Sequence, residues 1–111
     1  MREVSGAVIP VTNPVTQDVA VALELWARGH GGFTWRTSDG VQPKSGFAVA
    51  VAGCEKRLEV GEPLHSLTIL AFGHEHAQNI AAGNLVFRGG VCIGAWFNGA
   101  TQRWYLDLSV V

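Results

Sequence analysis

The stretch VCIGAWFNGATQRWYLDLSVV, residues 91–111, contains two apolar runs on either side of the turn sequence Asn98-Gly99-Ala100-Thr101. Asn-Gly between apolar runs is a strong signal for a tight turn between antiparallel strands. In the second run, Trp104, Leu106 and Leu108 alternate with polar residues, as one face of an extended strand does. The stretch therefore predicts a β-hairpin whose loop is longer than two residues.

A second pair of extended segments is predicted upstream. Phe33-Thr34-Trp35-Arg36 alternates aromatic and polar residues, and Gly46 to Val51 is an apolar run. Ser38-Asp39-Gly40 between them has the composition of a turn. We expect these two segments to pair as another hairpin with a long connection, followed by a polar break at Cys54-Glu55-Lys56-Arg57.

Helical spacing of apolar residues occurs in two places. The first predicted helix runs from Thr16 to Arg28, with Asn13 or Thr16 as its N-cap and Gly29 as its C-terminal stop. The second runs from about Ser66 to Ala82 and ends at Gly83.

These elements predict one α+β domain spanning residues 1–111, with residues 1–14 as an irregular N-terminal segment. The expected architecture is an antiparallel sheet of four to five strands with two helices. Gly31-Gly32-Phe33 and Gly89-Gly90-Val91 open corresponding segments of the two halves. An internal α-β-β-α-β-β duplication and a plain α+β fold without a repeat both predict this pattern.

The composition is apolar and weakly charged. Hydrophobic residues make up 48% and charged residues 15% of the chain, and eight Lys and Arg against nine Asp and Glu give a net charge of −1. This composition excludes intrinsic disorder and gives no basic face, which disfavours a nucleic-acid partner. Nucleic-acid binding through Arg36, Arg57, Arg88 and Arg103 with aromatic stacking therefore ranks last among the alternatives. No apolar run reaches the ~18–20 residues of a membrane span, and Pro10 breaks the apolar stretch that an export signal needs. The expectation is a cytoplasmic protein without a membrane partner.

The most conspicuous ionisable cluster is His74-Glu75-His76. On a helix, residues two apart point about 200° apart, so these histidines do not converge on one metal ion. We expect His74 to be packed and Glu75 and His76 to be exposed, and we expect no metal and no cofactor. Cys54 and Cys92 have no metal-binding or redox spacing and are interpreted as small buried apolar side chains.

No Ser, Cys or Thr stands in a recognisable signature of nucleophilic catalysis. The sequence leaves enzymatic activity undecided and favours a non-enzymatic protein. The alternative is a small enzyme or ligand-binding protein with a pocket between helices and sheet. Its polar groups would be His30, His65, His74 and Asp107.

Aromatic residues give a more specific prediction. Adjacent rings such as Trp96-Phe97 and Trp104-Tyr105 point to opposite faces of a sheet, so both faces carry large rings. Helices cover one face, and the rings on the other either fill the core or form a binding surface rimmed by arginine. The candidate binding residues are Trp35, Arg36, Trp96, Arg103, Trp104 and Tyr105.

Short patterns in the chain resemble a known group of proteins. They are Gly31-Gly32-Phe33-Thr34, Ser45-Gly46-Phe47-Ala48-Val49, Gly94-Ala95-Trp96 and Trp104-Tyr105-Leu106-Asp107-Leu108-Ser109. These patterns are similar to those of small uncharacterised proteins encoded on bacterial plasmids and phages, over about residues 29 to 110. The resemblance implies an accessory protein of a mobile genetic element and carries over no catalytic residue.

Together, these observations predict a small binding protein that acts through protein–protein contacts on an aromatic sheet surface. The expected partners are a second copy of the chain, giving a homodimer, and a host or element-encoded protein.

Overall fold

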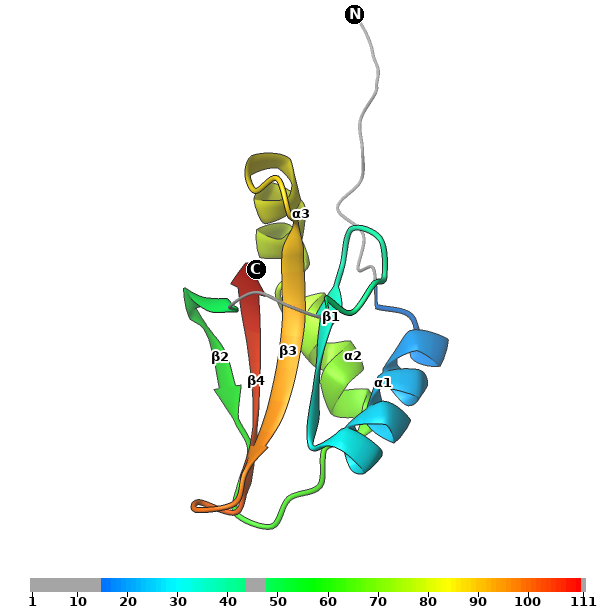
Figure 1. Cartoon of the computed structure of the whole chain (residues 1–111), viewed down its shortest axis with the longest axis vertical. Helices are drawn as coiled ribbons and strands as arrows, with labels where there is room; N and C mark the ends of the chain where they lie inside the picture. Colours follow the sequence, from blue (N-terminus) through cyan, green and yellow to red (C-terminus); the bar gives the residue numbers. More distant parts are fainter. Residues whose placement is uncertain (1–14, 44–47, 111) are drawn as a thin grey trace, which may run out of the picture.

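The structure is a computed structural model that describes residues 15–43 and 48–110. In chain order its elements are α1 (Gln17–His30), β1 (Gly32–Arg36), β2 (Val49–Arg57), α2 (Ser66–Glu75), α3 (Ala77–Val86), β3 (Val91–Asn98) and β4 (Arg103–Val110). The four strands form one antiparallel sheet in the order β1-β3-β4-β2 (Figure 1). The predicted α+β class and antiparallel sheet are confirmed. The sheet has four strands where four to five were expected, and there are three helices in place of two. The N-terminal segment predicted to be irregular, residues 1–14, lies outside the described residues.

The β3–β4 hairpin predicted from residues 91–111 is confirmed over its described part. Its strands pair from Val91↔Val110 to Asn98↔Arg103. In the turn, the Asn98 side-chain oxygen accepts hydrogen bonds from the backbone N–H groups of Ala100 and Thr101, at 2.9 and 3.3 Å. The turn is therefore closed by local chemistry that the sequence encodes directly.

The upstream hairpin was predicted wrongly. β1 pairs with β3 and β2 pairs with β4, so β1 and β2 lie at opposite edges of the sheet. Alternation identifies a strand but not its partner, and here the β3–β4 hairpin offers each upstream strand a free edge. The two halves thus share an order of elements but not a pattern of strand pairing. Part of the predicted run, residues 44–47, lies outside the described residues.

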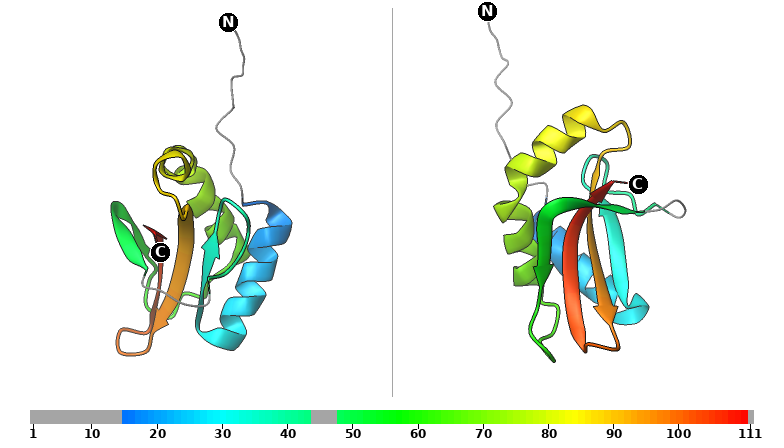
Figure 2. Two further views of the ribbon diagram at one scale, coloured as in Figure 1. Left: turned by 45° about the horizontal axis from the view of Figure 1, so that its top comes forward. Right: turned by 90° about the vertical axis from the view of Figure 1, so that its left-hand side faces the viewer.

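All three helices lie on one side of the sheet (Figure 2). The strand register assigns two faces, which we call the helix-covered face and the opposite face. On the helix-covered face are Phe33, Trp35, Val91, Ile93, Ala95, Phe97, Trp104, Leu106, Leu108 and Val110. On the opposite face are Thr34, Arg36, Cys92, Gly94, Trp96, Tyr105, Asp107 and Ser109.

Helix α1 begins as predicted and ends slightly later. The Thr16 hydroxyl accepts a hydrogen bond from the Val19 N–H and caps the N-terminus. The C-cap is Gly31, in the left-handed conformation with φ 75°, and its N–H donates to the Ala27 carbonyl at 2.8 Å. The predicted stop Gly29 lies inside the helix, because the left-handed residue that ends it comes two positions later.

Glu24 ties α1 to α2. Its carboxylate accepts a hydrogen bond of 2.6 Å from the Ser66 backbone N–H at the start of α2, and it also pairs with Arg28 one turn along α1. The Ser66 N–H and the Arg28 charge hold the pKa of Glu24 below its usual range. His65 caps the same helix, since its Nδ1 accepts from the Leu67 N–H at 3.2 Å. These contacts fix α1 and α2 as one unit over the sheet.

The second predicted helix is divided at His76 into α2 and α3. The predicted stop Gly83 lies inside α3, which continues to Val86. A Cβ at position 83 would collide with the Cγ2 of Val91, so this glycine allows the close approach of α3 to β3. Here glycine serves packing between two elements rather than helix termination.

Strand β2 contains an irregularity that its sequence pattern did not predict. The register with β4 shifts between Ala50 and Glu55, and Gly53 has φ 80°. Val51 and Cys54, an odd three residues apart, both belong to the core side of the strand. The bulge turns Cys54 to the same side of the strand as Val51. Residues 54–57, which were interpreted as a polar break, are therefore part of β2.

Candidate binding surfaces

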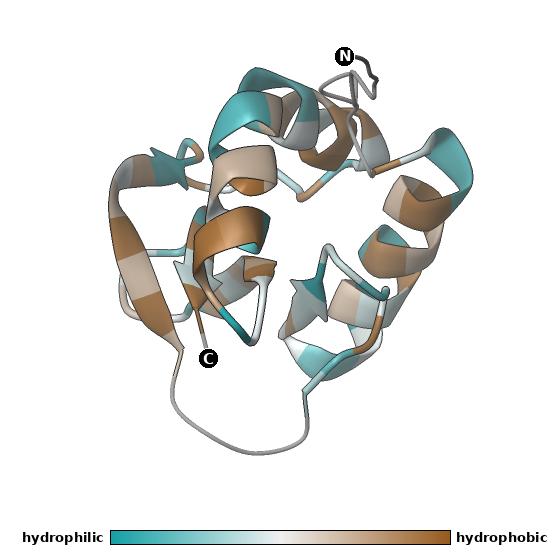
Figure 3. Ribbon diagram, turned by 90° about the horizontal axis from the view of Figure 1, so that it is seen from above, coloured by the Kyte–Doolittle hydropathy of each residue, from teal (hydrophilic) through white to brown (hydrophobic). Residues whose placement is uncertain are grey.

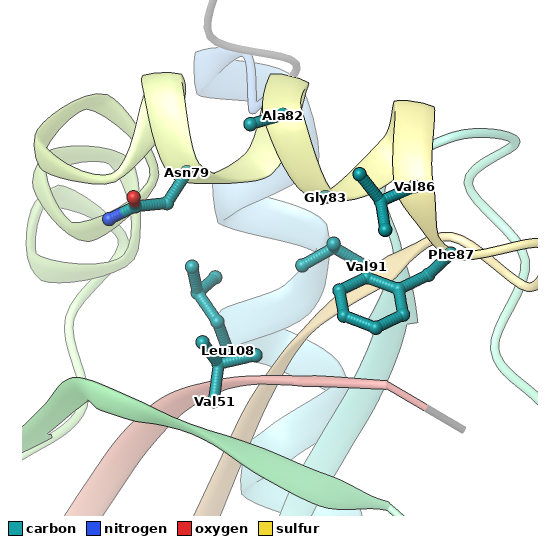
Figure 4. A pocket seen from close by; sticks show the side chains of 8 residues that line it. All are labelled: Val51, Asn79, Ala82, Gly83, Val86, Phe87, Val91 and Leu108. Carbon is teal, nitrogen blue, oxygen red and sulfur yellow. The ribbon is translucent and has the colours of Figure 1, made fainter.

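A groove runs between α3 and the sheet at the β2 side of the molecule (Figure 4). Its volume is about 230 Å³. It is lined by Val51, Asn79, Ala82, Gly83, Val86, Phe87, Val91 and Leu108. Asn79 is the single polar side chain among them, and its Nδ2 donates to the Cys54 Sγ at 3.7 Å. The groove therefore suits apolar side chains.

Apolar residues next to this groove are strongly exposed. Leu85 is 86% and Val86 is 76% exposed, and on the neighbouring strand Val49 is 62% exposed. Figure 3 shows hydrophobic segments on both α3 and β2. We call the groove together with Val49, Leu85, Val86 and Phe87 the α3 surface.

The opposite face carries an aromatic pair near the β3–β4 turn. The rings of Trp96 and Tyr105 stack with their centroids 5.2 Å apart and their planes 10° apart. Arg57 of β2 lies directly opposite Tyr105 in the register, and Arg103 precedes Tyr105 by two residues on the same face. The Tyr105 hydroxyl lies 3.3 Å from the hydroxyl of Thr101. This pair confirms that adjacent aromatic residues of the hairpin point to opposite faces.

The remaining predicted binding residues lie elsewhere. Trp35 and Trp104 are on the helix-covered face, where Trp35 is 8% exposed and Trp104 packs against the core with Phe97 at 5.5 Å. Arg36 is on the opposite face, where Asp39 holds it with two hydrogen bonds of 2.8 and 2.9 Å. Placing Trp35 at an exposed surface is a prediction that its burial contradicts, because strand alternation puts its ring on the helix-covered face, in the core and next to Gly40.

Next to the aromatic pair, the opposite face carries a row of small and polar residues. Asp107 lies opposite both Gly94 and Glu55 in the register, and Ser109 lies opposite Cys92. The Asp107 carboxylate lies over Gly94, since a Cβ there would be 2.7 Å from its Oδ1. Burial, reinforced by the charge of Glu55, raises the pKa of Asp107 to about 6. The Ser109 hydroxyl is buried and has no hydrogen-bond partner among the described residues.

This polar row lacks the features that activate a nucleophile. Burial raises the pKa of the Cys92 thiol, which keeps it protonated and unreactive at neutral pH. Neither Ser109 nor Cys92 is in hydrogen-bond contact with a base in the described part of the chain. What the row can do is exchange a proton at Asp107 near pH 6.

The four polar groups of the alternative pocket do not come together. His30 stacks on Trp26 at the end of α1, His65 caps α2, and His74 is exposed. Asp107 is on the face that the helices do not cover. The pattern also assigned the packed histidine wrongly: His76, at the break between α2 and α3, contacts Phe72 at 4.6 Å, whereas His74 points to solvent.

Metal-binding clusters and membrane-spanning helices are both absent from the described residues, 15–43 and 48–110. Within them no three His, Cys, Asp or Glu side chains are grouped as a metal site would require. None of the helices there has the length and apolar character needed to span a bilayer. Comparison with known proteins adds nothing to this picture, since no family model, no curated protein and no solved structure matches the chain.

Two features of the candidate binding surfaces were missed in the sequence. One is the α3 surface, although the absence of any charged residue from 77 to 87 was a visible signal. A solvent-facing helix usually has a polar face, so its absence indicates an interface. The other is the position of Arg57 beside Tyr105, which depends on the β2–β4 pairing and on the bulge. The sequence had offered Arg57 only as a candidate contact to nucleic acid.

Proposed function

We propose that the chain is a non-catalytic binding protein that associates with a second copy of itself through the α3 surface. The observation that carries this proposal is an apolar groove bordered by Val86, which is 76% exposed, with exposed Leu85 next to it on α3. Burying a side chain of this kind contributes about 1.5–3 kcal/mol. In the monomer these side chains stay in contact with water, and burying them in an interface would stabilise the dimer by that amount.

The α3 surface contains both a projection and a recess. Val86 is exposed at the end of α3 and borders the groove, whose sheet side is formed by Val51 and Leu108 (Figure 4). Leu85 is exposed on the adjoining side of the same helix. In a two-fold dimer each copy presents the same patch, so the projection of one copy can enter the recess of the other. An arrangement of this kind closes on itself and gives a dimer rather than a chain of subunits.

Charge favours a second copy over other partners. Residues 77–87 carry no charged side chain, so two copies can approach without like-charge repulsion. A strongly acidic or basic partner would instead find no opposite charge there and would lose hydration on binding. A standard interface buries about 800 Å² per partner, with an apolar centre and a polar rim. The α3 surface supplies the centre, and exposed Arg88 and Glu75 at the two ends of the helix region supply a rim.

The test is the concentration dependence of mass in solution. Sedimentation equilibrium or light scattering should show a monomer–dimer equilibrium for the wild-type chain. Val86→Glu places a charge at the mouth of the groove and should shift the dissociation constant upward by at least about 30-fold, as expected for a central interface residue.

Leu25→Glu is the matched control. Leu25 is also exposed on a helix, at 58%, but lies on α1 away from the groove. Its replacement should leave the equilibrium unchanged. A wild-type chain that remains monomeric at millimolar concentration, or an equal effect of the two variants, would refute the proposed interface.

The wider setting is proposed from the sequence alone. The resemblance to plasmid- and phage-encoded proteins supports an accessory role in a mobile genetic element, and the composition supports a cytoplasmic location. A second partner, encoded by the host or the element, fits a protein with more than one binding surface.

A further inference from the structure

The aromatic pair on the opposite face is framed by two arginines. Across the sheet, one row runs Arg57, Tyr105, Trp96 and Gly32, and Arg103 lies one step closer to the β3–β4 turn. Directly opposed side chains in such rows lie about 5 Å apart. We call Arg57, Trp96, Arg103 and Tyr105 the platform.

Neither arginine of the platform is paired with a carboxylate in the described part of the chain. Within residues 15–43 and 48–110, neither Arg57 nor Arg103 makes an ion pair, whereas Arg28 and Arg36 are each paired with a carboxylate on their own element or turn. Trp96 is 37% exposed, and Tyr105 is partly exposed. Trp, Tyr and Arg are the residues that contribute most to protein–protein binding free energy.

We infer that the platform binds an acidic segment of another protein, in which carboxylates flank an apolar or aromatic side chain. The guanidinium groups of Arg57 and Arg103 pair with the carboxylates, and the exposed edge of the stacked rings packs against the apolar residue between them. This partner is distinct from the second copy, because the α3 surface is uncharged and lies on the helix-covered side of the sheet.

An acidic protein segment fits the platform better than a nucleic acid does. Nucleic-acid affinity comes from the neutralisation of several phosphates by a basic surface. Here two free arginines stand beside Glu55 and Asp107 in the next row, and the whole chain has a net charge of −1. Two arginines suffice for two carboxylates but not for a continuous phosphate backbone.

The test uses two fluorescein-labelled probes, a ten-residue peptide of alternating glutamate and leucine and a ten-nucleotide oligothymidine. Fluorescence anisotropy against the full chain should show binding of the peptide that weakens as the salt concentration rises from about 0.05 to about 0.5 M. Arg57→Gln and Arg103→Gln should each raise the dissociation constant roughly three- to tenfold, and Trp96→Ala should raise it by a similar factor. The same peptide with glutamine in place of glutamate should not bind.

Arg88→Gln is the matched control, since it removes one exposed arginine next to α3 and away from the platform. It should leave peptide binding unchanged. Tighter binding of the oligothymidine than of the peptide, or an Arg88→Gln effect equal to that of Arg57→Gln, would overturn the inference. Because Val86→Glu should not affect peptide binding, failure of the platform and failure of the dimer interface are distinguishable.

Discussion

The two sides of the sheet differ in how completely the helices cover them. On the β1–β3 side, α1 and α2 are joined by Glu24, and β3 buries its first five residues, Val91 to Ala95. On the β2 side, Cys54 is the single buried residue of β2, because α3 approaches the sheet closely at Val91 of β3, where Gly83 faces it. The same sheet therefore has a packed half that supplies stability and a loosely covered half that is available for binding.

Truncating the packed core should have the largest effect. Ile93 of β3 is fully buried, so Ile93→Ala should lower the free energy of unfolding by about 2–5 kcal/mol through lost burial and a residual cavity. Val49→Ala, at an exposed position of β2, should change it by less than about 0.5 kcal/mol. Denaturant titrations of both variants measure the difference, and similar losses would show that the two halves are equally packed.

Neutralising Asp107 should stabilise the protein. Its pKa is raised from 3.8 to about 6, so the folded state holds this proton more tightly than the unfolded chain. The free energy of unfolding should therefore fall as pH rises from about 4 to about 6, by up to about 3 kcal/mol. Asp107→Asn should remove this pH dependence and be more stable than wild type at pH 7. Thermal unfolding at pH 4, 5, 6 and 7 tests this, and a variant less stable at pH 7 would contradict it.

Adding a methyl group at the contact between α3 and β3 should change the free energy of unfolding less than Ile93→Ala or Asp107→Asn does. Alanine is the better helix former by about 1 kcal/mol, yet Gly83→Ala should lower stability by about 1 kcal/mol because the new Cβ collides with Val91. Gly29→Ala is the control, since a Cβ at this position in α1 meets nothing within 4 Å. That variant should be neutral or more stable. If both substitutions stabilise the chain, α3 does not depend on close approach to the sheet.

The sequence predicted those parts of the fold that local chemistry determines. The β3–β4 turn is closed by Asn98, and Thr16 caps the start of α1, so both could be located within a few residues. Strand pairing could not be predicted in the same way. Which edge of the hairpin takes β1 depends on contacts far apart along the chain, such as Phe33 against Ala95.

The candidate site was predicted only in part. Trp96, Arg103 and Tyr105 do share one face, because alternation fixes the facing of neighbours in a strand. Trp35 was assigned to the wrong side of the sheet. The side on which its ring lies follows from the pairing of β1 with β3, which the sequence did not predict. The α3 surface was missed although residues 77–87 carry no charge, because the sequence was read as one helix and the structure divides it at His76.

The bulge at Gly53 has a further consequence for how copies of this chain meet. β2 is an edge strand, and a regular apolar edge can recruit strands from other molecules and grow into aggregates. The irregularity at Gly53 interrupts that edge, and the charged run Glu55-Lys56-Arg57 follows it at once. Both features oppose fibre-like strand addition. A protein with an apolar helix surface beside this edge can thus form a closed pair while remaining protected against open-ended growth.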